Sequence, residues 1–263
     1  MTRPAPRLFV DAALGEGARV PAAREQWTYL TTVLRLGEGD DVLLFNGRDG
    51  EWRARLAAES RKSGALIVAE RLRAQTGGAD LHLLFAPLKH ARLDYMAQKA
   101  VEMGVSALRP TLTARTQVSR VNLDRLRANA IEAAEQCGVL RLPEILPEAS
   151  LPAALAALEP ERLLIFCDEE ADLADPCAAL DATGWAGRPL AVLIGPEGGF
   201  APQERALLRA LPLVARLSLG PRVLRADTAA VAALALAQAR RRLAARRSVA
   251  VRSLRRRLVT ILP

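Results

Sequence analysis

The chain has 263 residues, of which 51% are hydrophobic and only 4% aromatic, which is enough apolar material for one large or two ordinary domains. Its three cysteines, none in a CxxC pair, exclude a disulfide scaffold and a cysteine-based zinc site, and its two histidines exclude an HExxH site. The first 25 residues hold charged groups and no apolar leader, and no apolar run approaches the roughly 18 residues of a membrane span. We therefore expect a cytoplasmic protein that binds neither metal nor membrane.

The formal net charge of +8 is concentrated at one end of the chain. Residues 238–263 hold nine arginines and no acidic residue, in clusters at 240–242, 246–247 and 255–257. Such runs suit phosphate binding, because each cation releases counterions from a nucleic acid. A solvated, partly disordered end is an equally good interpretation, and the rest of the chain is close to neutral.

Residues 1–75 read as short strands separated by turns. Brief apolar or alternating runs cover 8–10, 42–45, 51–56 and 66–68. Asn46-Gly47 tolerates the positive φ angles of tight turns, so we expect a hairpin over 45–51. This pattern favours a small β-barrel or sandwich. The segment 76–79 then reads as a linker.

Residues 76–240 alternate between strands and helices. The expected strands cover 81–87, 163–166, 190–194 and 214–219, and the expected helices cover 93–103, 122–137, 202–211 and 228–243. Continuous apolar runs such as 190–194 are typical of buried parallel strands. We therefore predict an α/β domain with a parallel sheet over 76–240, followed by a separate Arg-rich tail over 241–263.

Two glycine-containing loops follow predicted strands and precede predicted helices. The first is Ile194-Gly-Pro-Glu-Gly-Gly-Phe200, and the second runs from Leu217 to Ala230. Ligands of open α/β sheets bind beyond the carboxyl ends of the strands, and glycine lets the backbone approach them. Neither loop is a P-loop, because no Lys-Ser/Thr follows. Ordinary tight turns are the alternative, and Arg222 and Arg225 would hold an anion or form surface salt bridges.

These loops, together with several other segments in the same order, resemble the 16S ribosomal RNA uridine-N3 methyltransferase family of the SPOUT superfamily. The matching segments are 7–9, 33–40, 98–105, 135–138, 194–200 and 219–230. The resemblance implies a PUA-like β-barrel followed by a SPOUT α/β domain with a C-terminal trefoil knot. It also implies a homodimer that uses S-adenosylmethionine to methylate N3 of uridine 1498 in 16S rRNA of the small ribosomal subunit.

The resemblance also assigns residues to the cofactor and to the reaction. The cofactor-binding set is Leu193, Ile194, Gly195, Pro196, Glu197, Gly198, Gly199, Leu219, Gly220, Leu224, Arg225 and Thr228. The segment 167–169 would form a third wall, although its acids also suit a solvated turn. Uridine N3 carries a proton, so Glu197 is the proposed base and Arg225 would stabilise negative charge on the uracil oxygens. His82 and His90 are alternative bases, although His82 lies within a predicted strand.

Basic residues along the chain would contact the RNA backbone. The predicted set is Arg7, Arg35, Lys62, Lys89, Arg92 and Lys99, with Arg115 beside them. Two departures from the family pattern lie at Val139, where an Arg is usual, and at Tyr29, where a His is frequent. A SPOUT enzyme that acts on another RNA and a non-catalytic RNA-binding ribosome-assembly factor therefore remain as alternatives.

Overall fold

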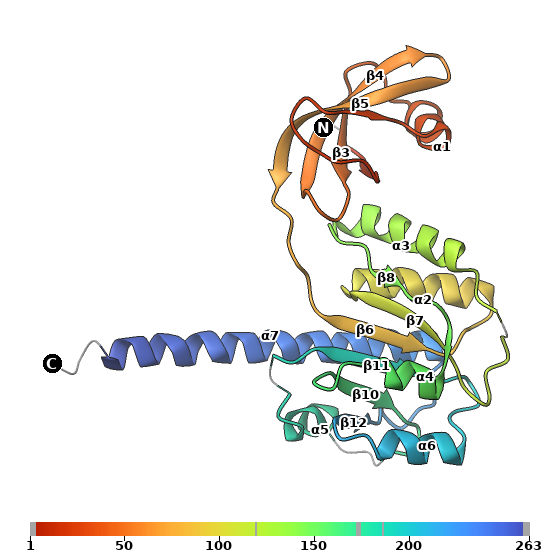
Figure 1. The fold of residues 1–263 in the computed structure, drawn as a ribbon, viewed down its shortest axis with the longest axis vertical. Helices are drawn as coiled ribbons and strands as arrows, with labels where there is room; N and C mark the ends of the chain where they lie inside the picture. The colour runs from red at the N-terminus through yellow and green to blue at the C-terminus, as the bar shows by residue number, and fades with distance from the viewer. Residues whose placement is uncertain (1–3, 119, 172–174, 186, 260–263) are drawn as a thin grey trace. The chain divides into compact units, whose positions relative to one another are not determined.

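The computed structural model describes residues 4–118, 120–171, 175–185 and 187–259. The chain forms two compact units (Figure 1). Each unit has its own buried core. The first unit contains Met1–Gly78 and Ala130–Leu142, and the second contains Ala79–Asn129 and Pro143–Pro263. The helix α3 (Leu123–Cys137) therefore begins in the second unit and ends in the first.

The first unit is built on a five-stranded sheet with the order β1-β3-β4-β5-β2. Its strands are β1 (Arg7–Phe9), β2 (Arg19–Pro21), β3 (Asp41–Phe45), β4 (Glu51–Ser60) and β5 (Ser63–Arg73). Antiparallel pairing brings Phe45 opposite Glu51, so the predicted hairpin is confirmed. Alternate residues of β3, among them Val42 and Leu44, are fully buried. This period of two is why one face of the sheet forms the core.

A helical segment interrupts the strands of the first unit, where the sequence predicted only strands. Helix α1 (Arg24–Thr28) continues directly into a π-helical turn, η1 (Tyr29–Val33). Trp27 and Leu30 point from this segment into the core and are almost fully buried. The Trp27 ring packs on the bare backbone of Gly64, where an added Cβ would lie 2.2 Å from the ring. Only Trp27 and Leu30 are buried among these ten residues, which is too weak a pattern to predict the helix.

The second unit contains the expected parallel sheet. The strand order is β12-β10-β11-β6-β7-β8, every neighbouring pair is parallel, and β9 pairs with β7. The strands are β6 (Leu81–Phe85), β7 (Ala107–Leu112), β8 (Glu144–Ile145), β9 (Ala149–Ser150), β10 (Leu163–Cys167), β11 (Leu190–Ile194) and β12 (Val214–Leu217). The prediction of an α/β domain is therefore confirmed, although β7, β8 and β9 were not expected.

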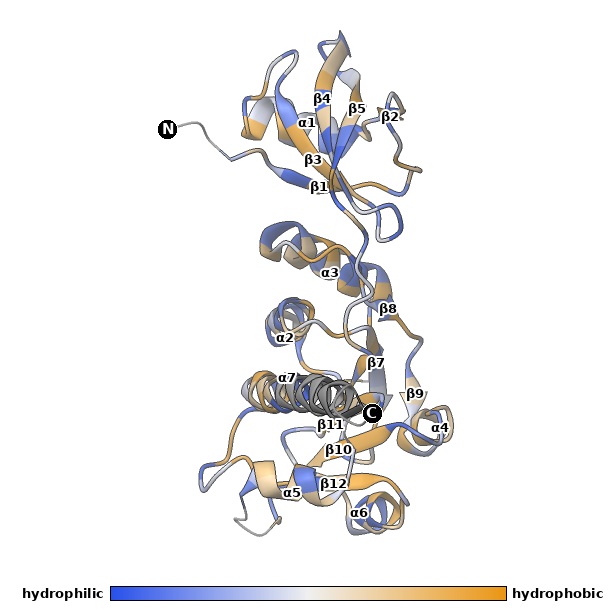
Figure 2. Cartoon of the chain, turned by 90° about the vertical axis from the view of Figure 1, so that its left-hand side faces the viewer, coloured by the Kyte–Doolittle hydropathy of each residue, from blue (hydrophilic) through white to orange (hydrophobic). Residues whose placement is uncertain are grey.

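Helices cover both faces of this sheet (Figure 2). One face packs against α2 (His90–Glu102), α5 (Pro176–Ala182) and α7 (Ala226–Val259), and the other against α4 (Leu151–Ala156) and α6 (Pro202–Arg209). Successive residues of β11 alternate between the two cores, with Val192 on the α7 side and Leu193 on the α6 side. Burial on both faces explains why β11 is continuously apolar.

Helix α7 differs from the prediction at both ends. It begins at Ala226, so Asp227 and Thr228 lie in its first turn and neither is its N-cap. It also continues without interruption from Ala226 to Val259, across the predicted boundary at 240. Alanine, leucine and arginine are strong helix formers, which explains why the helix persists. None of the described helices is long and apolar enough to cross a membrane.

Candidate functional site

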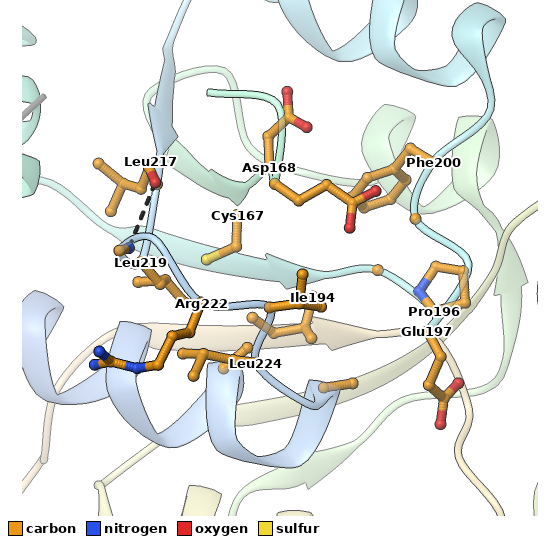
Figure 3. Close-up of a pocket in the computed structure, with 18 of the residues that line it drawn as sticks. Cys167, Asp168, Ile194, Pro196, Glu197, Phe200, Leu217, Leu219, Arg222 and Leu224 are labelled. Atoms are coloured by element: carbon orange, nitrogen blue, oxygen red, sulfur yellow. Dashed lines mark hydrogen bonds between the residues drawn. The ribbon is translucent and has the colours of Figure 1, made fainter. Parts of the chain in front are cut away.

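Three loops of the second unit line one pocket at the carboxyl ends of neighbouring strands (Figure 3). They follow β10, β11 and β12, and because β10 lies between the other two strands, the loops converge. The pocket holds about 820 Å³ of empty space, part of it open to solvent. The prediction that residues 167–169 form a third wall is confirmed, since Cys167, Asp168 and Glu169 line the pocket.

Two glycines shape the pocket wall for identifiable steric reasons. An added Cβ at Gly195 would lie 2.8 Å from the ring of Phe200, which itself packs edge-on against Phe166 with ring centroids 5.3 Å apart. Gly220 has a φ of +108°, a conformation that side chains disfavour. Both loops therefore bring bare backbone to the pocket, where N–H and C=O groups are accessible to a ligand.

The pocket contains most of the residues predicted to bind the cofactor. It is lined by Ile194, Gly195, Pro196, Glu197, Gly199, Leu219, Gly220 and Leu224. Figure 3 shows the Ile194, Leu219 and Leu224 side chains together in the pocket, with those of Glu197 and Arg222 at its margins.

Four predicted residues lie outside the pocket lining. Leu193 is completely buried in the core that faces α6, because alternate residues of β11 point to opposite faces. The Gly198 carbonyl accepts a hydrogen bond of 2.6 Å from Arg115 Nη1. Arg225, immediately before α7, and Thr228, in its first turn, are exposed. The structure therefore does not bring Arg225 into the pocket, and its role stays a prediction.

The acids of the loop after β10 are not a simple solvated turn. The Asp168 carboxylate is completely buried, and its oxygens lie 2.7 Å from Arg216 Nε and 3.3 Å from Arg205 Nε. Arg205, on α6, also forms ion pairs with Glu169 and Glu170. A buried carboxylate needs such cations, so this cluster fixes the loop against β12 and α6.

This cluster was missed from the sequence because Arg205 and Arg216 lie far along the chain from Asp168 and follow no recognisable motif. Arg222 also lines the pocket, although the sequence analysis did not assign it to the cofactor. It follows the Gly220-Pro221 turn and is exposed. The sequence did indicate Arg222, since it lies in the second glycine-containing loop and was expected to hold an anion or form a surface salt bridge.

Glu197 lies at the pocket margin and is half exposed, with Oε1 3.6 Å from Arg92 Nη1. Arg92 is on α2, so this ion pair joins the loop after β11 to that helix. Glu197 is thus the predicted base whose carboxylate is accessible from the pocket. Cys167, which also lines the pocket, is a thiol at neutral pH, because burial raises its pKa to about 12.

His82 lies on β6 and not among the pocket-lining residues. Its Nε2 is 3.6 Å from Asp80 Oδ1, at the amino end of the strand, whereas the pocket is at the carboxyl ends. Burial is the main cause of a lowered His82 pKa, and the charge of Arg162 lowers it further. The imidazole is therefore a packed, neutral group at pH 7. The side chain of His90 lies outside the described residues.

Arg7 does not present a free guanidinium to a ligand. Its Nε lies 2.7 Å from Glu51 Oε1, and its Nη1 and Nη2 donate hydrogen bonds of 2.9 Å to the carbonyls of Glu135 and Val139. These carbonyls are at the C-terminal end of α3, where a cation is favourable. The interpretation of Arg7 as an RNA contact therefore does not fit its surroundings.

The other predicted RNA contacts divide between the two units. In the first unit, Lys62 is exposed in a turn, and Arg35 is exposed in the irregular segment after η1 with a φ of +57°. In the second unit, Lys89 is exposed immediately before α2. Lys99, on α2, lies 2.7 Å from Glu102 and 5.6 Å from the centre of the Tyr95 ring.

Comparison with known families gives two matches in chain order. A family model described as an RNA methyltransferase domain matches residues 76–238, and one described as an RNA methyltransferase PUA domain matches residues 23–68. The first match includes all three pocket loops. The fold and site therefore define an RNA methyltransferase with an N-terminal PUA-like domain.

Individual relatives are more specific. The ribosomal RNA small subunit methyltransferase E of Rickettsia conorii is 29% identical over 87% of this chain and 93% of its own length. The protein of the same name from Mycobacterium bovis is 30% identical over 86% of this chain and 88% of its own. The chain belongs to the ribosomal RNA small subunit methyltransferase E family.

Solved structures agree with this assignment. The methyltransferase E of Neisseria gonorrhoeae, bound to S-adenosyl methionine, has a TM-score of 0.77 and 25% identity over 89% of this chain and 97% of that chain. A structure from Legionella pneumophila, assigned as a methyltransferase and in complex with the cofactor SAM, has a TM-score of 0.76 and 27% identity over 90% of this chain and 98% of that chain.

Proposed function

We propose that this protein transfers a methyl group from S-adenosylmethionine to N3 of uridine 1498 in 16S rRNA. The observation that carries the proposal is the single pocket formed by the loops after β10, β11 and β12, with the Glu197 carboxylate at its margin. Family membership supports the reaction class and the rRNA substrate. The particular uridine and its N3 atom come from the resemblance of the sequence motifs.

S-adenosylmethionine is the cofactor of this family, and the pocket suits it chemically. Ile194, Leu219 and Leu224 offer apolar surface for an adenine ring, and the glycine-containing backbone offers hydrogen bonds to its edge. Glu169 and Glu197 supply negative charge for an ammonium or sulfonium group, and Arg222 supplies positive charge for a carboxylate. When bound, the cofactor supplies a methyl group activated by a positively charged sulfur.

The residues of this chain would prepare the uracil for attack. The N3 proton must leave as the methyl group arrives, and Glu197 is the accessible carboxylate that would accept it. A cation near the uracil oxygens would stabilise the developing negative charge. Arg225 is the residue assigned from sequence, and Arg222, which lines the pocket, is the alternative that the geometry favours.

We further propose the finer architecture of the family for this chain. The first unit would close as a PUA-like barrel that binds RNA, with Arg35 and Lys62 on its surface. The second unit would form a SPOUT domain with a trefoil knot through the pocket loops, in a homodimer. The parallel strands and the convergence of three loops support this arrangement. An rRNA substrate implies a cytoplasmic location.

Transfer of a labelled methyl group to small ribosomal subunits that lack the native modification tests the reaction. We expect N3-methyluridine when the labelled nucleoside is identified by mass spectrometry. A different methylated nucleoside would indicate a SPOUT enzyme that acts on another RNA position. Cofactor binding without transfer to subunits or to free rRNA would favour a non-catalytic assembly factor.

A further inference from the structure

The second unit contains another groove, separate from the cofactor pocket. It lies between the segment after β6, the first turns of α2, residues 118 and 120–122 and the beginning of α3, and it holds about 570 Å³ of empty space, part of it open to solvent. Its apolar lining comes from Leu88, Leu93, Val118, Val121 and Leu126. A flat, uncharged group would therefore replace water favourably against this surface.

The polar edge of the groove is predominantly basic. Lys89 and Arg120 line it and are exposed. The Asp94 carboxylate also lines it, but Arg125 Nε and Asn129 Nδ2 donate hydrogen bonds of 2.9 and 2.7 Å to this carboxylate. Since Arg125 neutralises Asp94, Lys89 and Arg120 leave a positive edge that complements an anion.

Two arginines connect the groove walls to the cofactor pocket. Arg92 lies in the same helical turn as the groove residues Lys89 and Leu93, and it pairs with Glu197 of the pocket at 3.6 Å. Arg115 lies on the segment that leads to Val118, and it donates to the Gly198 carbonyl at 2.6 Å. The loop after β11, which lines the pocket, is therefore held by two arginines whose chain neighbours line the groove.

We propose that this groove binds the base of an RNA nucleotide adjacent to the target uridine, with the phosphate of that nucleotide at Lys89 and Arg120. The inference rests on the proposed function. N3 lies on the Watson–Crick edge, so the target base must leave its pairing, which exposes a neighbouring base as well. An apolar surface beside cations is the combination that holds single-stranded nucleotides.

The experiment measures the affinity of the full-length protein for a fluorescent single-stranded RNA with the rRNA sequence around uridine 1498. We expect Val118→Trp, which fills the groove, to weaken binding about tenfold, and Arg120→Gln to weaken it severalfold. Arg188→Gln is the matched control, because Arg188 is exposed before β11, at the opposite end of the strand from the pocket. This control should bind like the wild type.

Two further RNAs identify what the groove holds. One is abasic at the nucleotide before the target uridine, and the other is abasic at the nucleotide after it. The abasic RNA that lacks the bound base should bind the wild type about tenfold more weakly, and Val118→Trp should then cause little further loss. If, with each of the two abasic RNAs, Val118→Trp weakened binding as much as it does with the intact RNA, the two losses would be additive and the proposal would be overturned. So would wild-type affinity of the groove variants, or a change in Val118→Trp confined to self-association.

Cofactor binding and methyl transfer separate failure of the groove from failure of the proposed function. We expect the groove variants to bind S-adenosylmethionine like the wild type, since neither residue lines the cofactor pocket. If the groove variants bind RNA normally and the wild type is active, the groove proposal is wrong and the proposed function stands. A wild type that binds the cofactor but methylates no RNA would overturn the proposed function.

Discussion

Glu197 is the residue on which the proposed chemistry depends most. We expect Glu197→Gln to lower the rate of methyl transfer about 100-fold, the usual contribution of a general base, at saturating cofactor. Arg225→Ala should also lower turnover, because a cation near the uracil oxygens would be lost. The measurement is single-turnover methyl transfer at saturating RNA.

His82→Asn is the comparison for both variants, since the His82 imidazole is neutral and lies away from the pocket. It should retain most of the activity. Wild-type turnover in Glu197→Gln and Arg225→Ala would remove both assignments. Loss in Arg222→Ala but not in Arg225→Ala would move the cationic role to the pocket-lining arginine.

Glu51 is the most consequential buried carboxylate of the first unit. Burial alone would raise its pKa, but hydrogen bonds from Arg73 and Arg7 outweigh burial and hold the pKa below its usual value of 4.5. We expect Glu51→Gln to lower the free energy of unfolding by about 3 kcal/mol at pH 7, because two arginines lose their counter-charge. Urea unfolding followed by tryptophan fluorescence measures this difference.

The contribution of Glu51 to the free energy of unfolding should decrease as the pH falls. A carboxylate whose pKa is lowered by folding stabilises the protein above its unfolded-state pKa and loses that contribution as the pH falls through the folded-state value. The difference between wild type and Glu51→Gln should therefore shrink below about pH 4.5. A difference that does not change with pH would contradict the ion-pair explanation. Glu70→Gln is the control, because Glu70 forms an exposed ion pair with Arg53. It should change the free energy of unfolding by less than about 0.5 kcal/mol.

At the scale of elements, the sequence predicted the strands, turns and helix ends that depend on local residue patterns. The runs 163–166 and 190–194 form buried strands because they are uniformly apolar, and the Asn46-Gly47 turn forms its hairpin. Helix α3 ends just before Gly138, whose φ of +78° suits a helix terminus, as expected. The two glycine loops were located correctly because each joins a strand to a helix.

Elements that depend on distant contacts were not predicted. Strand β8 has only two residues and exists because it pairs with Ala107 and Leu108 of β7. The burial of Asp168 depends on Arg205 and Arg216, which are brought to it only by folding. Arg7 likewise looks like a surface cation until α3 is placed beside it. Tertiary structure, not local propensity, decides these positions.

The C-terminal half of α7 is the element whose role is least explained by the family. The match to the RNA methyltransferase domain ends at residue 238, whereas the helix continues to Val259. Near that boundary, Arg240 pairs with Asp181, and Arg241 Nη1 donates to the Asp80 carbonyl at 3.0 Å. A truncation that keeps Arg240–Arg242 should therefore leave the second unit folded.

We expect removal of residues 243–263 to weaken RNA affinity and to reduce its dependence on salt. Six arginines would be lost, and each cation that contacts a phosphate contributes about 0.7–0.9 to the slope of log K against log salt. Equilibrium binding at several salt concentrations measures this slope. A full-length control with those six arginines changed to glutamine should lose the same slope, since Gln retains helix propensity. An unchanged slope would indicate a passive extension.

At the scale of the whole molecule, the chain combines two units that differ in the surfaces they present. The second unit holds the pocket and the groove, and the first presents exposed cations on a β-sheet domain. The relatives from Rickettsia conorii and Neisseria gonorrhoeae are matched over 93% and 97% of their lengths, so both units are common to these proteins. The arginine-rich end of α7 lies beyond the residues matched by the RNA methyltransferase domain.

The most direct measurement is primer extension across uridine 1498 on small subunits that lack the native modification, after incubation with this protein and S-adenosylmethionine. A methyl group on N3 blocks base pairing, so reverse transcriptase should stop one nucleotide before this uridine. Gly195→Leu, which fills the pocket where even a Cβ would lie 2.8 Å from Phe200, should produce no stop. Full read-through with the wild-type protein, or a stop that persists with Gly195→Leu, would contradict methylation of this uridine from this pocket.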